Sequence, residues 1–222
     1  MPAASLSSSL SAQGFHFTYS TRVHVEDVSA VANCSLHIVH VLPPDVYADQ
    51  YELALRPGYA SSLRGTSDLE RPVAAVDKNG SVLLIDVEIV EDTRYEYTVD
   101  IPLHARYGHP AEESGRPYHT IILPPPLGFW ACPTSELSRP FPEQLVPHVS
   151  PDAFAFSSIS LIPHTPSDER AEVTIPVGKL GDLAMVDIGT AAVMLIMFSY
   201  IVVVSIRTAR RLRHDAHKVK GD

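Results

Sequence analysis

The feature that most constrains this chain is a run of 19 uncharged residues, Ile188 to Ile206, near its C-terminus. A helix of that length, at about 1.5 Å per residue, covers the roughly 30 Å hydrocarbon layer of a membrane. A helix buried in a soluble core usually keeps a polar face, and this stretch has none. We therefore predict one transmembrane helix over residues 183–206, with the lipid bilayer as its surroundings.

Charge differs sharply on the two sides of this stretch. Residues 1–187 contain 11 Lys and Arg against 24 Asp and Glu, whereas residues 207–222 contain six against two. The acidic part offers no cluster of basic residues for phosphate contacts, so the chain is not expected to bind nucleic acid. The basic residues after the span are Arg207, Arg210, Arg211, Arg213, Lys218 and Lys220.

The basic tail also predicts how the chain crosses the membrane. Positive charge concentrates on the cytoplasmic side of a span, so residues 207–222 should be cytoplasmic and the preceding domain luminal. Lys218 and Lys220 fit the K-x-K-x-x pattern by which membrane proteins are retrieved to the endoplasmic reticulum. We therefore expect a single-pass protein of the endoplasmic reticulum membrane. A basic anchor without a retrieval role is the alternative.

The N-terminal sequence does not fit this topology directly. Its first residues contain neither a basic start nor an apolar run of about 7 to 15 residues, so they do not form a signal peptide. Three explanations stay open. The true start lies upstream of Met1, the late helix drives translocation, or the protein is tail-anchored with its domain in the cytosol.

Alternation of apolar and polar residues predicts β-strands ahead of the span. The clearest strand runs from Tyr95 to Tyr107, where the odd-numbered side chains should be buried. A second covers Val82 to Val90, and we expect these two strands to pair as a hairpin across residues 91–93. Further strands are expected at residues 15–25, 34–41, 51–55, 119–123, 153–161 and 171–177.

Short strands at this spacing, without a convincing amphipathic helix, predict a mostly β fold. We expect an antiparallel β-sandwich-like domain over residues 15–182. Residues 1–14, rich in Ser and Ala, are expected to be disordered or a truncated N-terminus. Between residues 123 and 176 lie 11 of the 19 prolines, which favour irregular extended links and edge strands there.

Two kinds of covalent modification are consistent with a luminal domain. Asn33 and Asn79 each begin an N-x-[ST] sequon, and Asn79 is the better acceptor because it lies in a predicted turn. Cys34 and Cys132, which are the only cysteines, could form a disulfide in an oxidising lumen. They could equally remain two buried thiols.

The sequence offers no pattern that predicts catalysis or a bound cofactor. The 11 histidines lack the spacing of a metal site, and His37 and His40 would point to opposite faces of one strand. The motifs of a phosphate-binding loop and of a serine nucleophile elbow are absent. We therefore predict no catalytic, cofactor-binding or metal-binding residues.

Three segments together resemble the PIG-X family. They are LPPDVYADQYEL at residues 42–53, IPLHARY at 101–107 and PPPLGFWACP at 124–133, and the PVGKLGD run at 176–182 is also similar. The resemblance covers most of residues 20–206. The family usually has Gly where Asp45 stands, which would alter the turn. The motif positions are Pro43, Pro44, Tyr47, Tyr51, Glu52, His104, Arg106, Tyr107, Pro124, Pro125, Trp130 and Cys132.

The resemblance implies a non-catalytic role in glycosylphosphatidylinositol (GPI) anchor biosynthesis. PIG-X is the accessory subunit of GPI mannosyltransferase I, and it stabilises the multi-spanning PIG-M subunit that adds the first mannose. Two other classes remain: a tail-anchored adaptor with a cytosolic β domain, and a luminal enzyme with a pocket where His104 or His119 meets a carboxylate. Large side chains such as Tyr47, Tyr107 and Trp130 fill a core or anchor an interface, with the core favoured.

Overall fold

The computed structural model describes residues 4–66, 68–89, 96–112, 114–135, 140–165 and 171–219. The chain forms two compact units. The first combines Met1–His109 with Tyr118–Val177, and the second combines Pro110–Pro117 with Gly178–Asp222. The first unit is the β-rich domain, and the second contains the long C-terminal helix.

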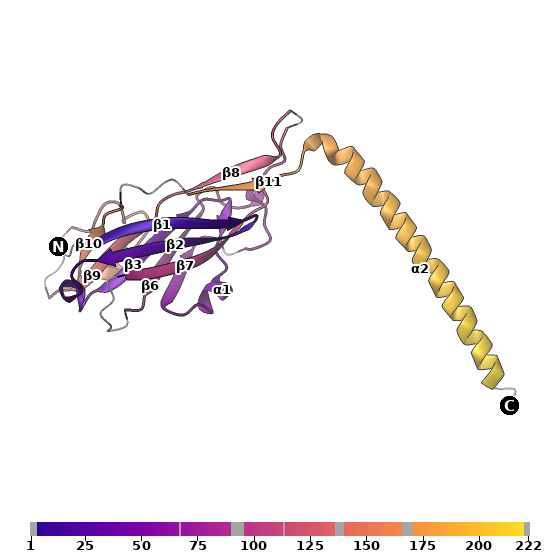
Figure 1. Cartoon of the computed structure of the whole chain (residues 1–222), viewed down its shortest axis with the longest axis horizontal. Coiled ribbons are helices and arrows are strands. Elements are labelled where there is room, and N and C mark those ends of the chain that lie inside the picture. Colours follow the sequence, from indigo (N-terminus) through magenta and orange to yellow (C-terminus); the bar gives the residue numbers. More distant parts are fainter. Residues whose placement is uncertain are drawn as a thin grey trace. The chain divides into compact units, whose positions relative to one another are not determined.

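One layer of the β-rich domain is a four-stranded antiparallel sheet. Its strands lie in the order β1 (Ala4–Gln13), β2 (His16–Val25), β7 (Glu96–Ala105) and β4 (Val46–Tyr47), as Figure 1 shows for the three long strands. Buried and solvated side chains alternate along β2 and β7, with Phe17, Tyr19 and Val99 among the buried ones. This period of two gives the sheet one apolar face.

The second layer is a five-stranded sheet. Its order is β10 (Ser157–Ile162), β9 (Leu127–Pro133), β3 (Ser35–Leu42), β6 (Ser81–Val87) and β5 (Tyr59–Arg64). A separate antiparallel pair is made by β11 (Ala171–Pro176) and β8 (Tyr118–Leu123). All strand pairings within these sheets are antiparallel.

The main core lies between the two layers. It receives Tyr19 and Ile101 from the first sheet, Ile38 and Trp130 from the second, and Ile175 from the separate pair. A smaller core on the other face of the second sheet contains Val39, Phe129, Ala131, Leu145 and Val149. Because β3 contributes to both cores, six of its eight residues are buried. The predicted mostly β sandwich is therefore confirmed.

Short helical segments connect the strands. The α-helix α1 (Gln50–Ala54) begins at Asp49, whose carboxylate accepts a hydrogen bond of 2.8 Å from the Tyr51 amide. The strand expected at residues 51–55 is therefore wrong, because the capping residue Asp49 starts a helical turn. The 3₁₀ segments are η1 (Val28–Val31), η2 (Val73–Ala75), η3 (Pro151–Phe154) and η4 (Leu180–Asp182).

Residues 4–13 form a strand, contrary to the expectation that the N-terminal residues are disordered. Residues 4 to 13 form β1, which pairs with β2 along its whole length, from Ala4 opposite Val25 to Gln13 opposite His16. The two strands meet at Gly14, whose φ of 63° suits the tight turn. Leu6 is fully buried in the core. The Ser-rich composition concealed an edge strand with few apolar side chains.

The expected hairpin between β6 and β7 is also wrong. β6 pairs with β3 and β5, whereas β7 pairs with β2 and β4 in the other sheet. Both strands alternate over most of their length, but Tyr107, expected to be buried, is 74% exposed, whereas Pro102 and Arg106, expected to face solvent, are buried. The alternation identified the strands but could not choose their partners, which come from distant parts of the chain. Tyr95 lies outside the described residues.

The C-terminal helix α2 runs from Leu183 to Val219. Its apolar part is long enough to cross a membrane: within Leu180–Arg213, an 18-residue stretch has a mean hydropathy of 2.2, and none of that stretch is buried. Within the same unit, the Ala111 amide donates to the Gly178 carbonyl and the Leu180 amide donates to the Ala111 carbonyl. The loop 110–117 is thus hydrogen-bonded to the residues that lead into α2.

Candidate functional site

The first two family motifs meet on the outward side of the four-stranded sheet. Tyr47 on β4 and His16 on β2 lie directly opposite His104 on β7. The ring of His104 stacks on Tyr47, with centroids 5.1 Å apart, and meets His16 edge to face at 4.6 Å. Three rings from three neighbouring strands therefore form one continuous row.

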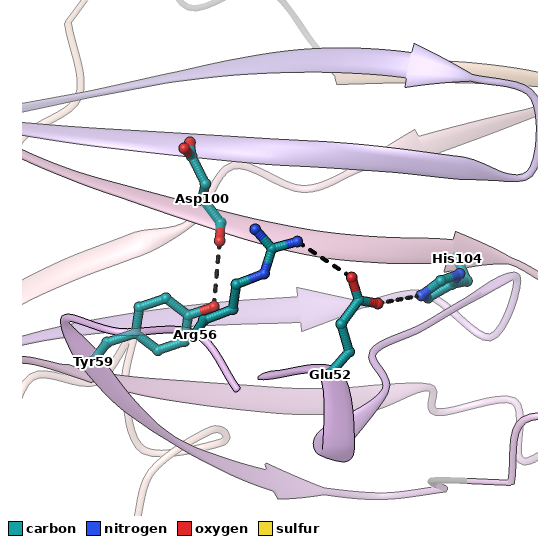
Figure 2. Close-up of polar contacts among 5 residues, drawn as sticks. All are labelled: Glu52, Arg56, Tyr59, Asp100 and His104. Carbon is teal, nitrogen blue, oxygen red and sulfur yellow. Dashed lines mark hydrogen bonds and ion pairs between the residues drawn. The ribbon is translucent and has the colours of Figure 1, made fainter. Parts of the chain in front are cut away.

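Helix α1 places an acidic side chain on this row. His104 Nε2 donates to Glu52 Oε2 at 3.0 Å, and Glu52 Oε1 accepts from Arg56 at 3.3 Å, as Figure 2 shows. Nearby, the Tyr59 hydroxyl donates to the carbonyl of Asp100 at 3.3 Å. These contacts attach α1 to β7 at His104, which is paired with Tyr47 of β4, and attach the start of β5 to β7 at Asp100, beyond the two residues that β4 pairs.

Arg106 packs against the Tyr47 ring of this row. Its side chain is buried, its guanidinium lies 4.7 Å from the centre of the Tyr47 ring, and its Nη1 donates to the carbonyls of Asp68 and Arg71. Burial lowers the pKa of Arg106, and burial raises the pKa of Tyr47. Arg106 therefore links the ring row to residues 68–71 through hydrogen bonds to main-chain carbonyls.

Asp45, in the turn that follows Pro43 and Pro44, has a specific partner. Its carboxylate accepts from His119 Nε2 at 3.0 Å, and its carbonyl accepts from the Arg106 amide at 2.7 Å. The turn after Pro43 and Pro44 is closed by the Val46 amide bonded to the Pro43 carbonyl. Asp45 thus connects β8 to the end of β7.

Exposed apolar side chains border the ring row. Tyr107, in ring contact with Phe15 at 5.1 Å, is 74% exposed, and Tyr51 on α1 and Leu55 at its C-terminal end are exposed. A hollow of about 330 Å³ is lined by Phe15, His16, Tyr47, His104, Ala105 and Tyr107. A neighbouring hollow of about 390 Å³ is lined by residues that include His16, Glu52, Arg56 and His104. We call the set Phe15, His16, Tyr47, Tyr51, Glu52, Leu55, His104 and Tyr107 the ring surface.

The third motif, residues 124–133, contributes to the core and to a disulfide and not to the ring surface. Trp130 is in the main core, Pro124 and Pro125 are exposed, and Cys132 forms a disulfide with Cys34. The bond joins the residue before β3 to β9, next to the pair Ser35 and Ala131. The sequence had left this pairing open.

The remaining predicted sites are separate from the ring surface. Asn33 and Asn79 are both exposed in turns, and the main-chain N–H of Asn79 donates to the Asp77 carboxylate. Lys218 belongs to the last part of α2, and Lys220 lies outside the described residues. Among the described residues no group of three or more His, Cys, Asp or Glu is placed to hold a metal ion.

One polar arrangement was not found by sequence reasoning. Ser35 Oγ lies 2.7 Å from His37 Nε2, and His37 Nδ1 lies 2.6 Å from Asp86 Oδ1. This is the hydrogen-bond order of a serine hydrolase triad. The carbonyl of Ala131 is also within reach of the Ser35 hydroxyl, at 3.3 Å. Ser35 and His37 share a strand face, which the alternation reveals, but Asp86 comes from β6, and only the fold shows that pairing.

The fold and the ring surface together define a class of protein. It has a β-sandwich domain with an aromatic and histidine surface, joined to a helix that is apolar and long enough to cross a membrane. Comparison with known proteins then specifies the family. The PIG-X / PBN1 family model matches residues 12–206, and the chain belongs to this family.

Curated relatives agree with this assignment. The chain is 35% identical to Protein pbn1 of Neurospora crassa over 136 residues, 55% of this chain and 26% of the relative. It is 30% identical to Protein PBN1 of Gibberella zeae over 185 residues, which are 78% of this chain and 37% of the relative. It is 27% identical to Protein pbn1 of Schizosaccharomyces pombe over 177 residues, which are 76% of this chain and 49% of the relative. The matches thus cover less than half the length of each relative.

The solved structures add little. The crystal structure of BcpA, the major pilin subunit of Bacillus cereus, aligns with a TM-score of 0.31 and 10% identity, over 79% of this chain and 39% of that one. At this level of similarity we draw no conclusion from the alignment.

Proposed function

We propose that this chain is a non-catalytic subunit of GPI mannosyltransferase I, which stabilises the multi-spanning catalytic subunit of the PIG-M type in the endoplasmic reticulum membrane. In this role the β domain is luminal, the helix spans the bilayer and the tail is cytoplasmic. The proposal rests first on membership of the PIG-X / PBN1 family. Membership of that family supports a role in GPI-anchor biosynthesis, and the PIG-M type partner is part of the proposal.

One observation assigns the proposed contact with the catalytic subunit to particular residues. Motif residues that are separated in sequence, Tyr47, Glu52, His104, Arg106 and Tyr107, gather in one cluster. Aromatic side chains that are partly exposed and held rigidly are the residue type that dominates protein interfaces. The ring surface is therefore the proposed contact with the catalytic subunit.

The physical basis of stabilisation is mass action. A partner that binds only the folded catalytic subunit lowers the population of its unfolded and degradable states by a factor that grows with concentration over Kd. This role needs a folded surface and a shared membrane. It does not need a nucleophile, a metal or a cofactor.

The first test measures abundance and turnover separately. Removing this chain from cells should lower the amount of the catalytic subunit and of GPI-anchored proteins at the cell surface. His104→Ala should leave mannose transfer per assembled complex nearly unchanged, because His104 contributes to the contact surface and not to the reaction. The measurement is transfer from dolichol-phosphate-mannose, divided by the amount of complex.

The arrangement of Ser35, His37 and Asp86 supports a second candidate, a luminal hydrolase, and the same assay distinguishes it. Ser35→Ala at normal complex abundance should have no effect on mannose transfer, and a fluorophosphonate probe should not label Ser35. Labelling of Ser35, or a loss in turnover of more than about 100-fold for Ser35→Ala or His104→Ala, would favour an enzyme.

A further inference from the structure

The basic segment that follows the span carries a feature beyond its number of charges. A topology signal needs only an excess of Lys and Arg on one side. Here the segment continues α2 without interruption, so each arginine has a defined depth and direction. Arg207, Arg210, Arg211 and Arg213 are all exposed.

Three of these arginines share one face of the helix. At about 100° per residue, Arg210 and Arg211 lie within roughly 60° of Arg207 on either side of it, whereas Arg213 lies about 120° away. A hollow of about 480 Å³ is lined by Val204, Arg207, Thr208, Arg210 and Arg211, and not by Arg213. The hydroxyl of Thr208 already donates to the Val204 carbonyl at 2.9 Å. The guanidinium groups are therefore the polar groups that the hollow offers to a ligand.

The depth of these arginines matches the headgroup layer of a bilayer. The uncharged run ends at Ile206, so Arg207 stands at the edge of the hydrocarbon. From Arg207 to Arg211 the helix rises about 6 Å, and the headgroup region of one leaflet is roughly 5 to 7 Å thick. Val204, one turn before Arg207 or Thr208, remains at the depth of the acyl chains.

We propose that Arg207, Arg210 and Arg211 bind the phosphate of one anionic phospholipid, whose acyl chain packs on Val204. Guanidinium groups bind phosphate oxygens through paired hydrogen bonds, and three of them exceed the charge of one phosphodiester. An acidic protein segment could bind the same arginines, but it would have no acyl chain to pack on Val204 at the depth of the hydrocarbon. This inference depends on α2 crossing a bilayer and not on the accessory role.

The test uses the purified full chain in detergent, titrated with single lipids and monitored by native mass spectrometry. Phosphatidylserine and phosphatidic acid should bind more tightly than phosphatidylcholine. Arg211→Gln should weaken anionic lipid binding about fivefold, the factor that roughly 1 kcal/mol per arginine corresponds to. The triple variant R207Q/R210Q/R211Q should weaken it about 100-fold, and the matched control Arg213→Gln less than about twofold.

Four outcomes would overturn the proposal. Equal losses for Arg213→Gln and Arg211→Gln would mean general charge attraction. Displacement of the lipid by millimolar inorganic phosphate would mean a site for free phosphate. Unchanged lipid binding in the triple variant would refute the site. If that variant kept its lipid but no longer co-purified with the catalytic subunit, the occupant would be an acidic segment of that subunit.

Discussion

His40 shows how its neighbours determine the chemistry of a single residue. It lies on the core side of β3, its ring meets Tyr19 edge to face at 5.4 Å, and it is 2% exposed. Neither ring nitrogen has a hydrogen-bond partner among the described residues. Burial lowers the pKa of His40 to about 3, so the neutral ring behaves as part of the apolar core.

This pKa predicts a pH dependence of stability. Above pH 6.5 His40 is neutral in the folded and unfolded states and contributes no pH dependence. Between pH 6.5 and about 3 the unfolded state binds a proton at His40 that the folded state does not bind. The free energy of unfolding therefore decreases by about 1.4 kcal/mol for each unit by which the pH is lowered. Between pH 6.5 and 5 the wild type should therefore lose about 2 kcal/mol more than His40→Leu.

Trp130, the only tryptophan and buried in the main core, allows this to be measured. Urea unfolding of the full chain in detergent, followed by its fluorescence at pH 7 and pH 5, gives the free energy of unfolding of both proteins. Parallel losses in the wild type and in His40→Leu would show that His40 is not the proton acceptor.

At the scale of elements, the disulfide between Cys34 and Cys132 links two strands of one sheet. The bond joins positions 98 residues apart, one immediately before β3 and one within β9. In the chain-entropy model, closing a loop of that length stabilises the folded state by up to about 4 to 5 kcal/mol. The same bond holds β9 and β3 in register near Ser35 and Ala131.

We predict that the double variant C34S/C132S lowers the free energy of unfolding by about 3 to 5 kcal/mol. The measurement is urea unfolding of the full chain at pH 7. As a control, the wild type with and without reductant should differ by a similar amount, and the variant should not respond to reductant. A loss below about 1 kcal/mol would show that the bond adds little to the sheet.

The elements also show what the sequence could predict and why the rest was missed. Alternation of apolar and polar residues identified β2 and β7, because each buries one face against the core. It missed β1, where Leu6 is the one side chain fully buried among those described, and misread α1, whose Tyr and Leu residues resemble a strand. Pairing partners are not local, so the β6–β7 hairpin was wrong.

The candidate site could be predicted only in part, for the same reason. The family motifs identified Tyr47, Glu52, His104, Arg106 and Tyr107 as candidate residues. They did not show that these side chains lie together in the fold. Glu52 and His104 are 52 residues apart, and their contact depends on α1 lying beside β7. His16 and Phe15 carried no motif, and only the pairing of β2 with β7 brings them to the ring surface.

At the scale of the whole molecule, the proposed topology makes both sequons accessible to glycosylation. Asn33 and Asn79 are exposed, so a luminal domain should carry glycan, most readily at the Asn79 turn. Glycosidase treatment should increase the electrophoretic mobility of the protein made from its full natural start. The double variant N33Q/N79Q should already show that mobility. If its mobility equals that of the untreated wild type, and an N-terminal tag is digested in sealed vesicles, the domain is cytosolic.

The central claim is that the ring surface holds the catalytic subunit. The most direct measurement is co-purification of that subunit with full-length Y51S/Y107S, beside the control Phe156→Ser, which removes a similarly exposed ring elsewhere on the domain. Because a central aromatic anchor contributes about 2 kcal/mol, the double variant should retain less than about a tenth of the partner. Its unfolding midpoint should match that of the control. Full retention by Y51S/Y107S, or an equal loss in Phe156→Ser, would contradict the account.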